Sequence, residues 1–316
     1  MINYTQVSTN PAQFLALTAY TVPEFQALLP QFTAQFTAYM ATHTLAGAPR
    51  QARAYGAYAN SPLPTPDDKL FFILVYLKTA NLQVVQGALF GMAQPVANQW
   101  IHRLLPSLNQ ALAAVGELPA RTMATLKFDP DQAGLYFHDG TERPINRPTD
   151  DEDQTTYYSG KKKQHTVKNN GIINGRCKII FLTETVAGKK HDKKLADETG
   201  YPLPAGSILV QDTGFQGFNL DEVLILQPKK KPRGKTLSAL SKALNQWISR
   251  LRIRIEHAIG GAKRYRIVKD KLRMWKKGIR DLVFETCCGL HNFRLNFRPW
   301  HYETSLPLKS LMLKSL

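Results

Sequence analysis

The sequence predicts an all-α N-terminal region followed by an α/β domain in which helices flank a mixed β-sheet. Up to about residue 118, apolar residues recur every three or four positions, as they do on the buried face of a helix. Beyond about residue 131, short apolar runs bounded by turn residues follow the order strand, strand, strand, helix, strand, strand, helix. This order is typical of an α/β domain.

The composition indicates a folded protein with a polyanionic partner. The chain has 316 residues, 43% of them hydrophobic, which is enough for a core and favours two domains over one. A net charge of +17 and a pI near 9.8 attract polyanions, and nucleic acid is the large anionic partner that fits best. Ribosomal and membrane-surface roles stay open on charge alone.

Neither a membrane protein nor a disulfide-bonded one is predicted. No apolar run approaches the roughly 20 residues that span a bilayer, and the N-terminus lacks the basic-then-apolar order of a secretory signal. The cysteines Cys177, Cys287 and Cys288 form neither a disulfide framework nor a paired metal motif, so we expect them to be buried. We therefore expect a soluble intracellular protein without a membrane partner.

The N-terminal half divides into a helical region with a connector, over residues 1–64, and a second helical unit over residues 65–118. Residues 21–45 carry phenylalanines and leucines at helical spacing. The stretch that follows, to about residue 66, is rich in Ala, Gly, Pro and Tyr and reads as a connector. Thr65 is a candidate N-cap, with Pro66 suited to the first turn of the next helix.

Residues 82–104 have the pattern of a helix-turn-helix. A short helix, a break at Gly91 and a second helix with Trp100 on its apolar stripe succeed one another. In a DNA-binding motif the second helix would enter the major groove, and its candidate contact residues are Gln94, Asn98, Gln99, His102 and Arg103. The alternative is an ordinary helical hairpin, which the same spacing permits.

The α/β domain is expected over residues 131–298, after a linker over residues 119–130 and before a weakly ordered tail over residues 299–316. GLYFHDG predicts a strand that ends at Asp139, and SILVQDTGF predicts another that ends at Asp212. Asn174-Gly175 is a hairpin signal between two β-rich runs. Residues 237–265 predict a long helix that carries Glu256.

Glu256 is the only acidic residue between Val223 and Lys269, a stretch that contains thirteen Lys and Arg residues. If the fold brings Glu256 to Asp139 and Asp212, the three carboxylates repel one another unless a cation holds them, and oxygen ligands suit Mg²⁺ or Mn²⁺. The alternative is an i,i+4 ion pair between Arg252 and Glu256, worth about 0.2–0.5 kcal/mol.

Three motifs resemble those of bacterial insertion-sequence transposases with an RNase H-like catalytic domain, in the branch related to eukaryotic Harbinger elements. They are HDGTERPINRP with Asp139, VQDTGFQGF with Asp212, and RIRIEHAIGGAKRYRI with Glu256. The basic run KKKQHTVK and the helix-turn-helix pattern extend the resemblance over roughly residues 65–298.

The resemblance implies a DDE transposase that recognises terminal inverted repeats of double-stranded DNA, cleaves it and joins the freed 3′-hydroxyl to target DNA. Asp139, Asp212 and Glu256 would be its catalytic residues and would bind two Mg²⁺ or Mn²⁺ ions. A homodimer or higher homo-oligomer would act on DNA in the bacterial cytoplasm, at the nucleoid. The implied DNA contacts outside the helix-turn-helix are Lys161, Lys162, Lys163, Lys168, Arg252 and Lys263.

The sequence also departs from the family pattern. Ser249 stands where many insertion-sequence transposases have a tyrosine, which leaves the DNA contact of that tyrosine in doubt. Only 43 residues separate Asp212 from Glu256, so a large β insertion between them does not fit and the domain should be compact. The run KKKPRGK over residues 229–235 suits either a DNA backbone or solvent. DDED over residues 150–153 reads as a mobile loop.

Two other functions remain as alternatives. A metal-dependent nuclease would keep the three acids but perform no strand transfer. A domesticated DNA-binding protein would have lost catalysis, which the presence of Asp139, Asp212 and Glu256 disfavours.

Overall fold

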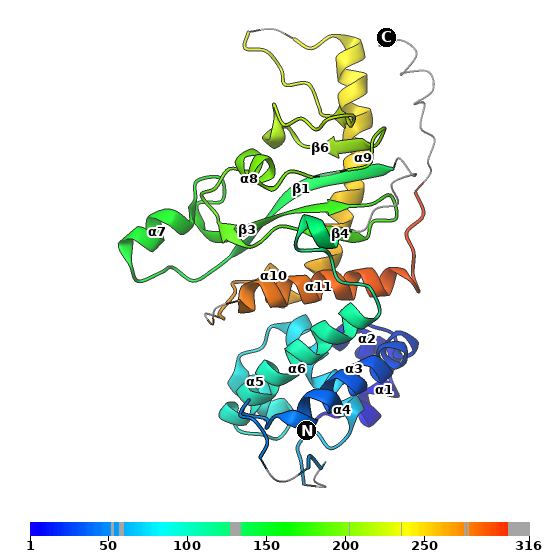
Figure 1. Ribbon diagram of the computed structural model, residues 1–316, viewed down its shortest axis with the longest axis vertical. Coiled ribbons are helices and arrows are strands. Elements are labelled where there is room, and N and C mark those ends of the chain that lie inside the picture. Colours follow the sequence, from blue (N-terminus) through cyan, green and yellow to red (C-terminus); the bar gives the residue numbers. More distant parts are fainter. Residues whose placement is uncertain are drawn as a thin grey trace.

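The computed structural model describes residues 1–51, 54–56, 60–126, 134–201, 203–234, 236–274, 276 and 278–302. N-terminal helices form one end of the molecule and a twisted sheet with its helices forms the other, with α10 and α11 between them (Figure 1). The part of the expected linker over residues 127–130, Lys235 and most of the expected C-terminal tail lie outside the described residues.

The described residues of the N-terminal end form six helices: α1 (Tyr4–Ser8), α2 (Pro11–Thr18), α3 (Val22–Thr42), α4 (Pro66–Thr79), α5 (Gln83–Leu89) and α6 (Gln94–Ala114). Helix α3 begins at a capping box, because the Thr21 side chain accepts from the Glu24 backbone and the Glu24 side chain accepts from the Thr21 backbone. Thr65 caps α4 as expected, and Pro66 occupies its first turn.

Helices α4, α5 and α6 adopt the helix-turn-helix arrangement that the sequence predicts. The turn between α5 and α6 depends on Gly91, which has a φ of +69°. A β-carbon at this position would lie 1.8 Å from the sulfur of Met1, but that side chain is exposed and could move aside, so the positive φ is what favours glycine. Trp100 lies in the core, as expected, at 5% exposure.

The sheet is mixed and has the strand order β2-β3-β1-β6-β7, with β4 and β5 paired to β3. Strand β1 pairs antiparallel with β3 and parallel with β6, and β6 pairs parallel with β7. The strands are β1 (Leu135–Pro144), β2 (Tyr158–Ser159), β3 (Gln164–Ile173), β4 (Ile179–Leu182), β5 (Val186–Ala187), β6 (Ile208–Gln211) and β7 (Leu224–Leu226).

Helices cover both faces of the sheet, and the alternation along β1 shows which side each residue faces. Phe137 belongs to the core shared with α9 (Ala239–Ala262) and α11 (Ile279–Leu295), whereas Tyr136 belongs to a smaller core beside α8 (Asp192–Thr199). The remaining elements are α7 (Asp151–Tyr157), α10 (Arg266–Lys269) and two short 3₁₀ turns, η1 (Met123–Thr125) and η2 (Thr213–Phe215). This helical region followed by a mixed sheet flanked by helices is consistent with the expected RNase H-like α/β fold.

Three local expectations differ from the structure. Strand β1 does not end at Asp139 but runs on to Pro144, because β3 continues to pair with it after β6 has stopped. The hairpin at Asn174-Gly175 exists, but its loop extends to Lys178 and places Cys177, with a φ of +61°, in the left-handed region. The acidic run over residues 150–153 caps and begins helix α7, with Asp150 accepting from the Asp153 backbone.

The main core crosses the boundary between the two halves. Helix α11 packs on α6, and the Tyr20 hydroxyl donates to the Leu290 carbonyl at 2.7 Å. All three cysteines are buried and free, as expected. In the described part of the chain, no helix is both long and apolar enough to cross a membrane.

Candidate active site

Asp139 and Asp212 lie at the edge where the parallel pairing of β1 and β6 ends. The last paired residues are His138 and Gln211, so Asp139 and Asp212 follow them on neighbouring strands. Strand β6 ends there, whereas β1 continues along β3, which leaves the edge of β1 open beside both carboxylates. Functional groups gather at such carboxyl ends of parallel strands.

The two carboxylates differ in their surroundings. Burial raises the pKa of Asp139 to about 6; Arg252 and the Gly140 N–H counter this, while Asp212 and Asp192 add to it. Asp139 Oδ1 accepts from the Gly140 N–H at 2.8 Å. The Asp212 side chain is 36% exposed and accepts from the Thr213 N–H at 2.6 Å, which caps η2.

Helix α9 supplies two cations to this edge. Arg252 Nη1 lies 3.5 Å from Asp212 Oδ1, and the Arg252 side chain is only 16% exposed. Lys263 Nζ donates to the Glu142 carbonyl at 3.1 Å, and burial lowers the pKa of Lys263 to about 8. Arg252 precedes Glu256 by four residues and Lys263 follows it by seven, so all three lie along one stripe of the helix.

Glu256 itself is exposed, and the expected cluster of three carboxylates is not assembled. Within the described residues, no group of three His, Cys, Asp or Glu side chains lies close enough to hold a metal ion. Arg252 of α9 and Lys263, its C-cap, make the contacts with the strands, whereas none of the described hydrogen bonds or ion pairs involves the Glu256 side chain. The described contacts also include no Arg252–Glu256 ion pair within 4.0 Å, so the structural alternative for Glu256 is not formed either.

The donor set at this edge still suits a hard divalent cation. Asp139 and Asp212 offer carboxylate oxygens there, which Mg²⁺ and Mn²⁺ prefer, and Glu256 is the expected third ligand. The guanidinium of Arg252 already provides a positive charge beside two of these carboxylates. The residues therefore fit a cation at the strand ends, although the third carboxylate does not complete the site in this structure.

Sequence reasoning missed Asp192, which lies close to both strand ends. A β-carbon on Gly140 would lie 2.8 Å from Asp192 Oδ1, and one on Gly214 would lie 4.0 Å from Asp192 Oδ2. Asp192 stands alone between two pairs of lysines in the run KKHDKK. This is the same signal, an isolated acid in a basic segment, that singled out Glu256.

Lys168 was expected to contact DNA, but in the structure it is paired with Asp192. Lys168 is 5% exposed, and its Nζ lies 2.9 Å from Asp192 Oδ1 and 3.6 Å from Glu142 Oε1. A buried ammonium that is already paired with two carboxylates is not available to bind a phosphate. By contrast, Lys161, Lys162 and Lys163 are exposed in the turn between β2 and β3.

The candidate recognition helix α6 shows three different environments for four of its five predicted contact residues. Gln99 is exposed. The amides of Gln94 and Asn98 donate to Gln83 Oε1 of α5, at 2.7 and 3.0 Å. Arg103 does not project from the helix as expected, because its guanidinium stacks on the Tyr39 ring, 3.8 Å from the centroid.

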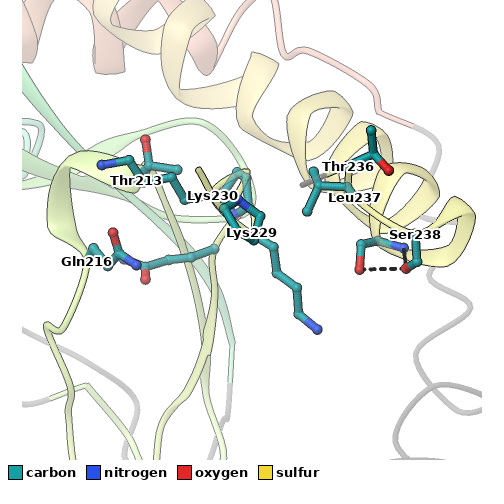
Figure 2. A pocket seen from close by; sticks show the side chains of 11 residues that line it. Thr213, Gln216, Lys229, Lys230, Thr236, Leu237 and Ser238 are labelled. Carbon is teal, nitrogen blue, oxygen red and sulfur yellow. Dashed lines mark hydrogen bonds between the residues drawn. The ribbon is translucent and has the colours of Figure 1, made fainter. Parts of the chain in front are cut away.

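A cavity of about 520 Å³ is lined in part by Thr213, the residue that follows Asp212. Thr213 and Gln216 lie on one side of it and Thr236 to Ser238, at the start of α9, on the other, with Lys229 and Lys230 between them (Figure 2). Lys229, Lys230 and Pro232 of the basic run thus line a hollow that also contacts Thr213, the residue after Asp212. Asn245 fixes the backbone of this loop, since it accepts from the Lys229 N–H at 2.8 Å and donates to the Lys229 carbonyl at 2.9 Å.

Comparison with known proteins agrees with this architecture. Residues 138–292 match the family described as DDE superfamily endonuclease, and residues 61–114 match the helix-turn-helix of that superfamily. The chain is also 31% identical, over 235 residues, to a probable transposase for insertion sequence element IS702 from Microchaete diplosiphon; the match covers 72% of this chain and 80% of the relative. No solved structure gives a significant match. The chain therefore belongs to the insertion-sequence transposases of the DDE superfamily.

Proposed function

We propose that the chain is an active transposase that binds the terminal inverted repeats of its element, cleaves DNA there and joins the freed 3′-hydroxyl to target DNA. The observation that carries this proposal is the meeting of Asp139 and Asp212 at the open edge of β1, in a chain that also has a helix-turn-helix. Such an enzyme would act on bacterial DNA in the cytoplasm, at the nucleoid.

In this proposal Asp139, Asp212 and Glu256 hold Mg²⁺ or Mn²⁺. Two such ions would activate the attacking oxygen and stabilise the leaving oxygen of an in-line displacement. Arg252 and Lys263, on the same stripe of α9, would place positive charge beside the phosphate and keep the strand carboxylates from repelling one another. The exposed Lys161, Lys162 and Lys163 would bind the DNA backbone.

Recognition of the ends would come from α6. Gln99 is exposed, and Gln94 and Asn98 present amides whose orientation Gln83 fixes; amide side chains of this kind read adenine in the major groove. Because the two ends of an element must be brought together, we also propose that a homodimer or higher homo-oligomer performs the reaction.

A strand-transfer assay tests the function directly. The wild-type chain is incubated with Mg²⁺, a pre-cleaved duplex that carries a 3′-hydroxyl at the element's end, and a supercoiled target plasmid. We expect joined products that disappear in the Asp139→Asn variant. Hydrolysis without joining would instead support the metal-dependent nuclease, and binding without either reaction would support the non-catalytic DNA-binding protein.

A further inference from the structure

Basic side chains gather where the last turn of α4 meets α10, at the junction of the helix-turn-helix and the sheet domain. Lys78 Nζ, from α4, donates to the Arg264 carbonyl at 3.2 Å. The guanidinium of Arg273 donates to the Ala80 carbonyl, which caps the C-terminal end of the same helix. We call Lys78, Arg266, Lys269, Lys271 and Arg273 the junction cluster.

The junction cluster holds like charges close together at a cost to the folded protein. Burial lowers the pKa of Lys78, and the neighbouring charges of Arg264, Arg266 and Lys269 lower it further. Asp270 pairs with Arg266 at 2.8 Å. Lys269 and Lys271 are exposed, and neither has an ion pair within 4.0 Å among the described contacts. A polyanion would relieve this repulsion.

Contacts connect the junction cluster to the candidate recognition helix. Arg273 donates to the carbonyl of Ala80, the C-cap of α4, and Gln83 begins α5 three residues later. Burial raises the pKa of the Tyr76 hydroxyl in the last turn of α4, and Arg273 and Gln83 both counter this rise. Gln83 is the residue that accepts from Gln94 and Asn98 of α6. The junction cluster therefore reaches the end of α4, three residues before the glutamine that orients the recognition residues.

The charge of Lys276 also acts on α6. Burial lowers the pKa of His102, and the charges of Lys276 and Arg103 lower it further. His102 lies one helical turn after Asn98. Cations from the segment after α10 thus flank the helix-turn-helix, although they belong in sequence to the sheet domain.

We propose that the junction cluster is a phosphate-binding surface through which the sheet domain grips the same DNA duplex that α6 reads. The ligand is the phosphodiester backbone, which exposed Lys and Arg side chains neutralise without reading sequence. This inference rests on the proposed binding of duplex DNA by the helix-turn-helix. It adds that the helix-turn-helix and the sheet domain form one continuous binding surface rather than two separate ones.

The test uses the double variant Lys269→Gln/Lys271→Gln in the full chain, because these exposed side chains hold no described backbone carbonyl. Affinity for a short, fluorescein-labelled duplex of random sequence is measured by anisotropy over a range of salt concentrations. Each lost phosphate contact should reduce the slope of log affinity against log salt by about 0.9, so we expect a reduction of roughly 1.8. The control is Lys189→Gln/Lys194→Gln, which changes the charge equally at exposed positions beside and within α8.

The outcomes separate the inference from the proposed function. A smaller slope in the junction variant, with an unchanged slope in the control, supports the phosphate-binding surface. An unchanged slope in the junction variant, or equal losses in both variants, overturns it. Failure of the wild-type chain to bind the duplex at all would overturn the proposed DNA-binding function itself, and the inference with it.

Discussion

The guanidinium of Arg252 serves both strand carboxylates of the candidate active site. It lies 3.5 Å from Asp212 Oδ1, and it offsets part of the burial that raises the pKa of Asp139. Because Arg252 is already paired with Asp212, it does not need Glu256 as an ion-pair partner. The exposed carboxylate of Glu256 is therefore free of a described structural role, which favours a chemical one.

We expect Glu256→Gln to abolish Mg²⁺-dependent cleavage while leaving the fold and DNA binding intact. The substitution keeps the size of the side chain but removes the negative charge that would offset the metal. The melting temperature should move little, because Glu256 is exposed and lies outside the described ion pairs. Cleavage assays, duplex-binding titrations and thermal melts of the same preparation measure the three quantities.

Glu152→Gln is the matched control, since Glu152 is exposed on α7 and should affect neither activity nor stability. Asp139→Asn and Asp212→Asn should behave as Glu256→Gln does. Cleavage within a few-fold of wild type in Glu256→Gln, together with a clearly lower melting temperature, would contradict the metal assignment and support a structural role.

Isolated acids in basic segments could be found from the sequence, but their partners could not. This reasoning identified Glu256, and applied to the run KKHDKK it would also have found Asp192. It could not show that Lys168 lies between Asp192 and Glu142, because that contact depends on the register of β3 against β1 and on the start of α8. Without these contacts, Lys168 could not be distinguished in the sequence from the exposed lysines of the same basic run.

At the scale of elements, two adjacent glycines of α9 have different surroundings. A β-carbon on Gly261 would lie 2.2 Å from Nδ1 of His291 on α11, whereas one on Gly260 would meet nothing within 4 Å. His291 is 2% exposed, and its Nε2 lies 3.0 Å from the Cys177 carbonyl, so its ring has little room to move. Gly261 is thus the position that lets α9 and α11 approach.

We expect Gly261→Ala to destabilise the protein by about 1–3 kcal/mol, because the added methyl group overpacks the contact between α9 and α11. Gly260→Ala should instead stabilise it by about 0.5–1 kcal/mol, since alanine is the better helix former at an exposed site. Urea denaturation of both variants measures the difference. Equal effects at the two positions would show that helix propensity, and not the approach of α11, decides the outcome.

The order and type of the main elements could be predicted because each has a clear apolar period, as in α3, α4, α9 and α11. The lengths of the helices and strands were harder to predict, because they depend on pairing with segments far along the chain. Strand β1 runs past Asp139 only because β3 continues beside it, and α7 forms where the acidic run suggested a loop. The stacking of Arg103 on Tyr39 could not be predicted either, because Tyr39 lies on a separate helix.

For the whole molecule, two buried histidines should make stability depend on pH. Burial lowers the pKa of His138 and of His291 to about 4, so the folded protein keeps both rings neutral where the unfolded chain takes up protons near pH 6.5. The unfolded state gains protons first on acidification. Stability should therefore fall between pH 6.5 and 4, by up to about 3 kcal/mol for each histidine.

Asp139 acts in the opposite direction, because its pKa is raised to about 6 and the folded state takes up that proton first. One carboxylate offsets only part of the loss caused by two histidines. Chemical denaturation across this pH range measures the net effect, and His138→Phe, which keeps an aromatic ring beside Phe215 and Phe218, should make the dependence shallower. A curve as steep as that of wild type would show that His138 is not responsible.

Finally, the shared core predicts that the two halves fold together rather than as independent domains. Asn109 of α6 donates to Glu285 and Thr286 of α11 at 3.1 Å, and Asn292 donates to the Glu117 carbonyl at 2.9 Å. A β-carbon on Gly289 of α11 would lie 2.7 Å from Leu118, which shows how closely the halves pack.

Expressed alone, a fragment of residues 1–126 would expose the apolar face of α6 that α11 covers, and should bind a hydrophobic dye and melt without a sharp transition. Co-expression with residues 134–316 should restore a cooperative melt, because the two fragments can rebuild the interface between α6 and α11. Calorimetry and dye binding on each fragment and on the pair measure this. A sharp transition and no dye binding for residues 1–126 alone would mean that the N-terminal helices form an independent domain. Their folding would then not need the contact with α11.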